Sequence, residues 1–198
     1  MPEVLIGVAG YAGAGKDTLA DLLVAHFGFT KMAFADPMRD MAAAIDPIVG
    51  YLDTEDPNED EIIRYTDAIE WHGYTDAKVL YPEIRRFLQR LGTEAGREGP
   101  LGQDIWVNVG MERAEAYDRV VFADTRFRNE AEAIKARGGR TIRIERPGVV
   151  APNDHTSEHD LAKWDFDLHV NNKGTIADML PRLEGFFARH FPRVMRIS

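Results

Sequence analysis

The sequence predicts an α/β fold in which helices flank a largely parallel central sheet. Short apolar runs without polar alternation recur along the chain, as in strands that are buried on both faces. Between them lie segments whose apolar residues repeat at helical spacing, which is the order expected of strand–helix–strand units. A chain of 198 residues with 44% hydrophobic and 29% charged residues suits one globular domain, and it disfavours collagen-like, coiled-coil and disordered proteins.

The N-terminal part contains the clearest strand–helix–strand pattern. Val4–Ala9 is a nearly all-apolar run that a glycine ends, as expected of a buried strand. Apolar residues then repeat at helical spacing, and Gly28 fits the left-handed position that often follows a helix. Residues 30–35 predict a second strand, after which Pro37 can open a helix over residues 38–45.

The acidic residues are concentrated in the next segment. Residues 46–76 include ten acidic side chains and one basic side chain, so this segment alone carries −9, the net charge of the whole chain. Because prolines and acidic residues fill residues 46–62, we expect a solvated loop or a helical flap there. Since 13 of the 24 basic residues lie within 85–146, an anionic ligand is expected outside the acidic segment.

The alternation of helices and strands continues to the C-terminus. A helix is expected over residues 82–91, where apolar residues share one side and Gly92 forms a tight helix exit. We then expect a strand, a helix, two strands and a terminal helix, over residues 119–123, 129–137, 141–145, 166–170 and 176–191.

The most informative motif is a glycine-rich segment between the first predicted strand and the first predicted helix. It reads GYAGAGKDT over residues 10–18 and has the G-x-x-x-x-G-K spacing of a phosphate-binding P-loop. Glycines allow successive backbone N–H groups to surround a phosphate, the helix N-terminus adds its positive dipole end, and the lysine can reach the β- and γ-phosphates. The predicted nucleotide-binding residues are Gly10, Ala12, Gly13, Ala14, Gly15, Lys16, Asp17 and Thr18.

The residue after the P-loop lysine departs from the motif. P-loops place Ser or Thr there, with the hydroxyl on Mg²⁺, whereas this chain has Asp17. Mg²⁺ prefers hard oxygen ligands, so we expect Asp17 to bind the ion directly or through water. Thr18 supplies a hydroxyl one position later, where it is better placed for a phosphate oxygen.

Two arginines follow the predicted strand 119–123. The strand delivers Asp124 to the edge at which open α/β sheets bind ligands, and Arg126 and Arg128 come just after it. Phosphoryl transfer needs cations around the developing charge, and arginine gives permanently charged, bidentate contacts. We therefore predict a catalytic role for Arg126 and Arg128 alongside Lys16.

Other arginines leave several interpretations open. One face of the predicted helix 82–91 carries a polar stripe, formed by Arg86, Gln89 and Arg90. Such a stripe is most often solvated, although the following Gly92-Thr93 has the composition of a turn that meets a nucleotide. Arg143 lies in the strand 141–145 and Arg146 follows it. Three interpretations of these two arginines remain open: they lie near an adenine, they belong to a lid, or they simply sit at a strand edge.

Composition excludes several classes of function. The chain has no cysteine, which excludes disulfides, thiolate metal sites and cysteine nucleophiles. No apolar run approaches the length of about 18 residues that a membrane span needs, and the N-terminus lacks the basic region of a signal peptide, so we expect a cytoplasmic protein. The acidic balance disfavours broad binding to nucleic acid or to anionic membranes.

Taken in order, these motifs resemble the deoxynucleoside monophosphate kinases of bacteriophages, of the type found in T4-like phages. Besides the glycine loop, the resemblance rests on the segments ADPMR (35–39), RRFLQRLGT (85–93), DIWV (104–107), DTR (124–126) with Glu130, RPG (146–148) and HTSE (155–158). These segments cover most of the chain. The LGT, DTR and RPG segments together are more specific than the P-loop, which many families share.

The resemblance implies transfer of the ATP γ-phosphate to a deoxynucleoside 5′-monophosphate (dNMP) with Mg²⁺. It implies a single P-loop kinase domain over residues 1–198, with a monophosphate-binding region over about 38–95 that includes the acidic insert 46–76, and a lid over about 126–162. Lys16 would hold the ATP phosphates, and Arg128 would be an additional transfer-site cation. The acceptor site would be lined by Arg39, Arg86, Gln89, Gly92, Thr93, Trp106, Asp124, Arg126 and Glu130.

The implied partner is a small molecule, with no nucleic acid and no membrane; a homodimer stays open, as does a host cytoplasm if the protein is viral. Three other functions remain as alternatives. A P-loop kinase of another small metabolite, such as dephospho-coenzyme A, shares the loop. A GTP-dependent switch would need a guanine-reading N-K-x-D segment, which Asn171-Asn172-Lys173-Gly174 does not supply. A DNA-processing ATPase is disfavoured by the acidic balance and the small size.

Overall fold

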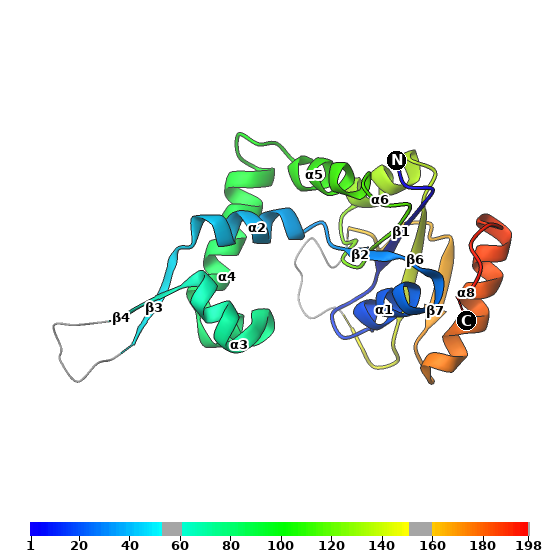
Figure 1. The fold of residues 1–198 in the computed structure, drawn as a ribbon, viewed down its shortest axis with the longest axis horizontal. Coiled ribbons are helices and arrows are strands. Elements are labelled where there is room, and N and C mark those ends of the chain that lie inside the picture. The colour runs from blue at the N-terminus through cyan, green and yellow to red at the C-terminus, as the bar shows by residue number, and fades with distance from the viewer. Residues whose placement is uncertain (53–60, 151–159, 198) are drawn as a thin grey trace. The chain divides into compact units, whose positions relative to one another are not determined.

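The computed structural model describes residues 1–52, 61–150 and 160–197. The chain divides into two compact units (Figure 1). The first unit comprises the residues up to Phe34 and those from Val107 on, and the second comprises Ala35–Trp106. The second unit is therefore inserted into the chain of the first.

The first unit is built on a five-stranded parallel sheet, as predicted. Its strands run in the order β2-β5-β1-β6-β7, and every neighbouring pair is parallel. In chain order they are β1 (Val4–Ala9), β2 (Thr30–Met32), β5 (Arg119–Phe122), β6 (Arg140–Glu145) and β7 (Leu168–Asn171). All six residues of the central strand β1 are buried, which explains its unbroken apolar sequence.

Helices cover both faces of this sheet. They are α1 (Lys16–Phe27), α5 (Ile105–Ala114), α6 (Arg128–Ala136) and α8 (Ile176–His190). The side chains of Ile6 and Val8 pack in one core with α1 and α8, whereas that of Leu5 packs in a second core with α5 and α6. The alternation of side chains along β1 thus supplies both cores.

Most predicted elements of the first unit are confirmed within one or two residues at each end. The predicted strand 30–35 was too long, because β2 ends at Met32 and the N–H of Phe34 donates to the carboxylate of Asp124 instead of continuing the strand. The strand predicted over 166–170 begins at Leu168. Helix α5 had not been predicted.

The second unit combines helices with a separate two-stranded antiparallel sheet. Its elements are α2 (Asp36–Ile45), β3 (Ile48–Leu52), β4 (Glu61–Arg64), α3 (Tyr65–Leu80), α4 (Pro82–Gln89) and the π-helical segment η1 (Arg90–Arg97). They share a core of their own, in which Ile63, Ala68 and Ile84 are among the buried residues. In Figure 1 the paired strands β3 and β4 extend away from the helices of this unit.

Two predictions in this unit were wrong. The segment 46–62 is not a loop or a helical flap in its described part, because Ile48–Leu52 and Glu61–Arg64 pair as strands. The β-branched and aromatic residues of these two segments suit a sheet. The prediction was wrong because it gave more weight to the acidic composition of the whole segment. Residues 53–60 of that prediction lie outside the described residues.

The helix that begins at Pro82 does not exit at Gly92. Helical turns continue through η1 to Arg97, and Gly92 is buried within them. A Cβ atom at this position would lie 2.6 Å from the sulfur of Met38 in α2, so glycine allows η1 to pack closely against α2. The predicted exit was instead a close packing contact.

No helix in the described part of the chain combines the length and apolarity that crossing a membrane requires.

Candidate active site

The glycine-rich loop connects β1 directly to α1, as its sequence predicted. Gly13 has φ of 80° and Gly15 has φ of 102°, in the left-handed region that favours glycine. Helix α1 begins at Lys16, so the N–H groups of its first turn adjoin the loop. This combination of loop and helix N-terminus is the arrangement that holds phosphate groups in α/β proteins.

The Lys16 ammonium lies over this loop. Its Nζ donates to the carbonyl oxygens of Gly10 at 2.7 Å and Tyr11 at 3.1 Å. The side chain therefore folds back over the loop, and its positive charge lies there. A bound phosphate would offer oxygen acceptors to the same ammonium group.

Asp17 projects from the first turn of α1 toward β2. Its carboxylate pairs with Lys31 at 2.9 Å, and Lys31 also pairs with Asp21 at 3.0 Å. Burial lowers the pKa of Lys31, but the hydrogen bonds and charges of Asp17 and Asp21 outweigh it, so that this pKa lies above its ordinary value. The Asp17 side chain is 81% exposed, so its ion pair with Lys31 leaves it accessible to water.

The oxygen atoms around Asp17 suit a metal ion that is bound partly by the protein and partly by the phosphates of a substrate. The described residues contain no group of three or more acidic, histidine or cysteine side chains that could form a metal cage. Mg²⁺ commonly binds through one or two protein oxygens together with substrate phosphates and water. Asp17 and the exposed Thr18 supply such oxygens beside the loop, so these residues fit Mg²⁺ in that form.

Asn172 holds the glycine loop from the end of β7, a role that sequence reasoning missed. Its Nδ2 donates to the carbonyl oxygen of Ala14 at 3.0 Å, and its backbone N–H donates to the carbonyl of Glu145 at 2.7 Å. A Cβ atom at Gly15 would lie 2.6 Å from the same Nδ2. The position of Asn172 after the last predicted strand was the only signal in the sequence.

The segment after β5 forms a tight turn whose backbone is held by carboxylates. Asp124 accepts a hydrogen bond from the N–H of Phe34 at 2.7 Å. Glu130, which is only 2% exposed, accepts from the N–H groups of Arg126 at 2.7 Å and Phe127 at 3.0 Å. Glu130 therefore sets the backbone of the turn, and the side chain of Arg126 starts from a fixed position.

A cavity lies where this turn meets the glycine loop. It is lined by Ala9, Gly10, Tyr11, Thr125, Arg126, Arg143 and Leu161. Arg126 is exposed there, and its side chain makes no hydrogen bond or ion pair with any other residue in the described ranges. The cavity thus brings together the loop, Arg126 and Arg143.

Arg128 lies elsewhere in the first unit. Its Nε pairs with Glu132 at 2.8 Å, and its backbone N–H donates to Asp160 at 2.6 Å. The hydrogen bond and charge of Glu132 raise the pKa of Arg128 above its ordinary value. Arg128 lines a second cavity together with Lys135 and Trp164, and not the cavity that Arg126 lines.

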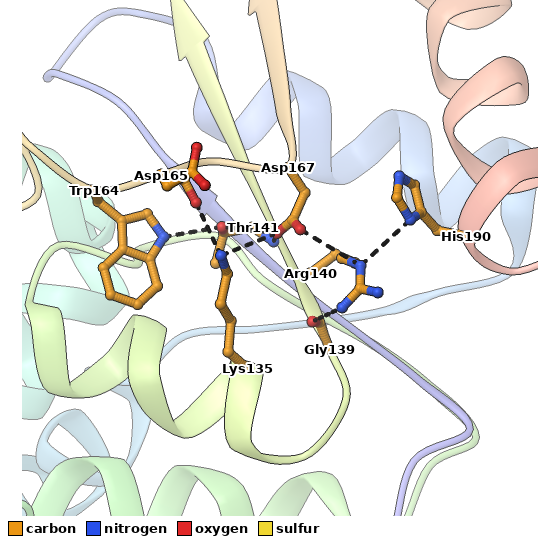
Figure 2. Close-up of polar contacts among 8 residues, drawn as sticks. All are labelled: Lys135, Gly139, Arg140, Thr141, Trp164, Asp165, Asp167 and His190. Carbon is orange, nitrogen blue, oxygen red and sulfur yellow. Dashed lines mark hydrogen bonds and ion pairs between the residues drawn. The ribbon is translucent and has the colours of Figure 1, made fainter.

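Figure 2 shows a polar network that fixes the start of β6. Asp167 accepts from the backbone N–H of the buried Thr141 at 2.8 Å, and it lies 3.5 Å from Arg140 and 3.9 Å from Lys135. The indole of Trp164 donates to the hydroxyl of Thr141 at 3.1 Å. Because this network holds β6 to the segment before β7, it also fixes the direction in which β6 delivers Arg143.

The second unit contains the remaining predicted residues. Arg39 pairs with Asp36 at 3.0 Å, and its guanidinium carbon lies 4.5 Å from the ring centre of Tyr74. Arg86 is 67% exposed and pairs with Glu83 at 2.7 Å, and this partner's hydrogen bond and charge raise the pKa of Arg86.

Three further predicted residues of this unit lie on α4, η1 and α5. Gln89 is exposed on the last turn of α4, and Thr93 is half-buried in η1. The indole of Trp106 is buried and donates to the carbonyl of Gly92 at 2.8 Å. Trp106 and Gly92 therefore form one packed contact, which orders the end of this unit.

Comparison with known proteins identifies relatives over most of the chain. The model of the deoxynucleotide monophosphate kinase family matches residues 58–183. A protein of Acanthamoeba polyphaga mimivirus, provisionally named a deoxynucleotide monophosphate kinase, is 28% identical over 91% of this chain and 94% of its own length. The deoxynucleotide monophosphate kinase of Enterobacteria phage T4 is 21% identical over 91% of this chain and 97% of its own.

Proposed function

Because the chain belongs to the deoxynucleotide monophosphate kinase family, we propose that it transfers the γ-phosphate of ATP to the 5′-phosphate of a deoxynucleoside monophosphate. In this reaction an oxygen of the acceptor phosphate forms a bond to the γ-phosphorus. The bond from the γ-phosphorus to the bridging oxygen breaks, and ADP leaves with that electron pair. The products are a deoxynucleoside diphosphate and ADP.

The observation that supports this reaction is the cavity between the glycine loop and Arg126. Lys16 and the N-terminus of α1 would bind the ATP phosphates, and Arg126 would contact the group in transfer. The acceptor phosphate is already an anionic nucleophile at neutral pH, so no general base is needed. Catalysis then consists mainly of alignment and of neutralising negative charge.

The residues proposed to contact the acceptor come from the resemblance described above. They are Arg39, Arg86, Gln89, Gly92, Thr93, Trp106, Asp124, Arg126 and Glu130. The contacts of Glu130 favour an indirect role, because its carboxylate is buried against the backbone of Arg126. The proposed monophosphate-binding region, 38–95, falls within the second unit. Part of the proposed lid, 126–162, lies outside the described residues.

Mg²⁺ would be held by the ATP phosphates together with Asp17, either directly or through water. When bound, the ion would supply charge neutralisation for the phosphates. The exposed ion pair between Asp17 and Lys31 does not prevent this, because surface ion pairs of this kind are weak. Arg128 remains a proposed additional cation, although its contacts with Glu132 and Asp160 do not support that role.

The experiment that tests this proposal is a substrate panel. ATP and Mg²⁺ are supplied with dGMP, dTMP, dCMP or dAMP separately, with dephospho-coenzyme A as the alternative acceptor, and ADP release is measured. We expect turnover with at least one dNMP and none with dephospho-coenzyme A. Turnover with dephospho-coenzyme A alone would support the alternative metabolite kinase.

Lys16→Ala and Arg126→Ala are expected to abolish this turnover while the fold is retained. Arg126 lines the cavity, Lys16 donates to the carbonyl of Gly10 in the loop, and neither residue belongs to a hydrophobic core. Arg137→Ala, on the exposed end of α6, is the matched control and should keep wild-type rates. Near-normal dNMP phosphorylation by Lys16→Ala, with an unchanged circular dichroism spectrum, would exclude the proposed site.

A further inference from the structure

A second arginine lies beside the glycine loop. β6 pairs with β1 so that Arg143 is opposite Ala9, the residue just before Gly10. Only 13% of the Arg143 side chain is exposed, and it lines the same cavity as Tyr11 and Arg126. Two positive charges, one from β6 and one from the turn after β5, thus share one cavity at the edge of the sheet where ligands bind in open α/β folds.

Aromatic rings and one carboxylate hold the Arg143 guanidinium in place. Its central carbon lies 5.3 Å from the ring centre of Tyr11 and 5.6 Å from that of Phe166. Its Nε donates to a carboxylate oxygen of Glu145 at 2.8 Å. That is its one hydrogen bond to another residue in the described ranges, and it uses Nε. The other N–H donors of a guanidinium are on its two terminal nitrogens.

The surroundings of Arg143 favour an anionic ligand over a purely structural ion pair. Glu145 is 53% exposed, and an ion pair with so exposed a partner contributes little to stability. Such a pair does not explain why a guanidinium is kept nearly buried in a cavity that also contains Arg126. Like charges in a partly dehydrated cavity repel each other unless an anion lies between them.

We propose that Arg143 is a second transfer-site cation, which donates hydrogen bonds to the phosphoryl group as it passes from ATP to the acceptor. This inference rests on the proposed function, because it assigns a residue to the same reaction. The charge of the group in transfer spreads over three equatorial oxygens, more than Arg126 alone can contact. The rings of Tyr11 and Phe166 and the carboxylate of Glu145 position the guanidinium before the substrates bind.

Three variants test this inference: Arg143→Gln, Arg143→Lys and the control Arg137→Gln. We expect Arg143→Gln to lower kcat by about 100-fold or more, with KM values for both substrates within about threefold of wild type. Arg143→Lys keeps the charge but loses the planar fork, so it should recover part of the lost rate. Arg137→Gln should match the wild type, and melting temperatures should stay close to the wild-type value in all three.

A binding measurement separates this inference from the proposed function. Aluminium fluoride with ADP mimics a phosphoryl group in transfer, and we expect Arg143→Gln to weaken binding of ADP–aluminium fluoride but not of ADP alone. The same selective loss in a chain that phosphorylates no dNMP would overturn the proposed acceptor and keep Arg143 as a transfer-site cation.

Three results would overturn the role of Arg143. One is a kcat within about threefold of wild type for Arg143→Gln, because a lost transfer-site contact must cost more than that. A second is equal weakening of ADP and ADP–aluminium fluoride binding. The third is unfolding of both Arg143 variants, since that result would make the residue structural.

Discussion

Single residues at the ends of strands control the shape of the nucleotide loop. Asn172 is the clearest case, because its side-chain amide donates to Ala14 in the middle of the loop and packs against Gly15. Without Asn172, the carbonyl of Ala14 loses the hydrogen-bond donor that keeps the loop in one conformation. A loop that is ordered before ATP binds loses less conformational entropy on binding.

Asn172→Ala should therefore weaken ATP binding. The lost hydrogen bond corresponds to about 1 kcal/mol, so we expect the KM for ATP to rise by about fivefold, with the KM for the dNMP unchanged. Initial rates at varied ATP and fixed dNMP give the result. Asn171→Ala is the matched control, because Asn171 is exposed at the end of β7 and no side-chain bond to the loop involves it in the described ranges. Equal KM values for both variants would contradict the role of Asn172.

At the residue scale, the candidate-site residues that the sequence identifies are those that belong to one continuous motif. Lys16 follows a strand and a glycine loop, and Arg126 follows a strand that ends in aspartate, so a local pattern was enough. Asn172 and Arg143 reach the loop only because β6 pairs with β1, and β7 pairs with β6, in the sheet. Strand order depends on packing between distant segments, and no spacing in the sequence encodes it directly.

Helix α3 supplies an aromatic support for a proposed acceptor residue. The ring of Tyr74 has the guanidinium of Arg39 at 4.5 Å and the ammonium of Lys78 at 4.1 Å from its centre. Arg39 comes from α2, so this contact links two helices of the second unit through a charged side chain. The ring restricts the positions that the arginine can occupy.

Tyr74→Leu should raise the KM for the dNMP by about two- to fivefold, because a cation–π contact contributes about 0.5 to 1 kcal/mol. The KM for ATP should stay at its wild-type value. Tyr74→Phe keeps the ring and is expected to behave like the wild type, which separates the effect of the ring from that of the hydroxyl group. If the Phe variant were as impaired as the Leu variant, the ring would not be the cause.

At the element scale, prediction succeeded where hydrophobic pattern and end signals agreed. β1, α1 and α6 have unbroken apolar runs or clear caps, and Gly28 ends α1 in the left-handed conformation that was predicted. The β3–β4 hairpin was missed because acidic residues and prolines dominate its segment, although Ile48–Leu52 and Ile62–Ile63 suit strands. Helix α3 was missed, and Gly73 interrupts its helical conformation with φ of 71°.

On the scale of the whole molecule, the excess of acidic residues belongs to one of the two structural units. The second unit contains the acidic segment, whereas the first contains Lys16, Arg126 and Arg143. The net charge of −9 is therefore compatible with the phosphate-binding site proposed above, because the basic residues proposed for that site lie on the other unit. Each unit also has hydrophobic clusters made only of its own residues.

Because the two units have separate cores, we expect a core substitution in one unit to weaken the binding of one substrate more than that of the other. Ile84 is fully buried in the core of the second unit, so Ile84→Ala should lower the free energy of unfolding by about 2 to 5 kcal/mol. Under conditions in which the variant stays folded, we expect weaker dNMP binding and wild-type ATP binding, because the glycine loop belongs to the first unit. Isothermal titration with each nucleotide, beside thermal unfolding, measures both effects.

The matched control for this prediction is Leu19→Ala, which removes an equally buried side chain from α1 in the first unit. Leu19→Ala should lower the free energy of unfolding by a similar amount. It should weaken ATP binding more than dNMP binding, because α1 carries the N–H groups that follow the loop. If each variant lost binding of ATP and of the dNMP to the same extent, the two cores would behave as one cooperative structure. If Ile84→Ala weakened mainly dNMP binding and Leu19→Ala mainly ATP binding, the inserted unit would bind the acceptor as a separately packed structure.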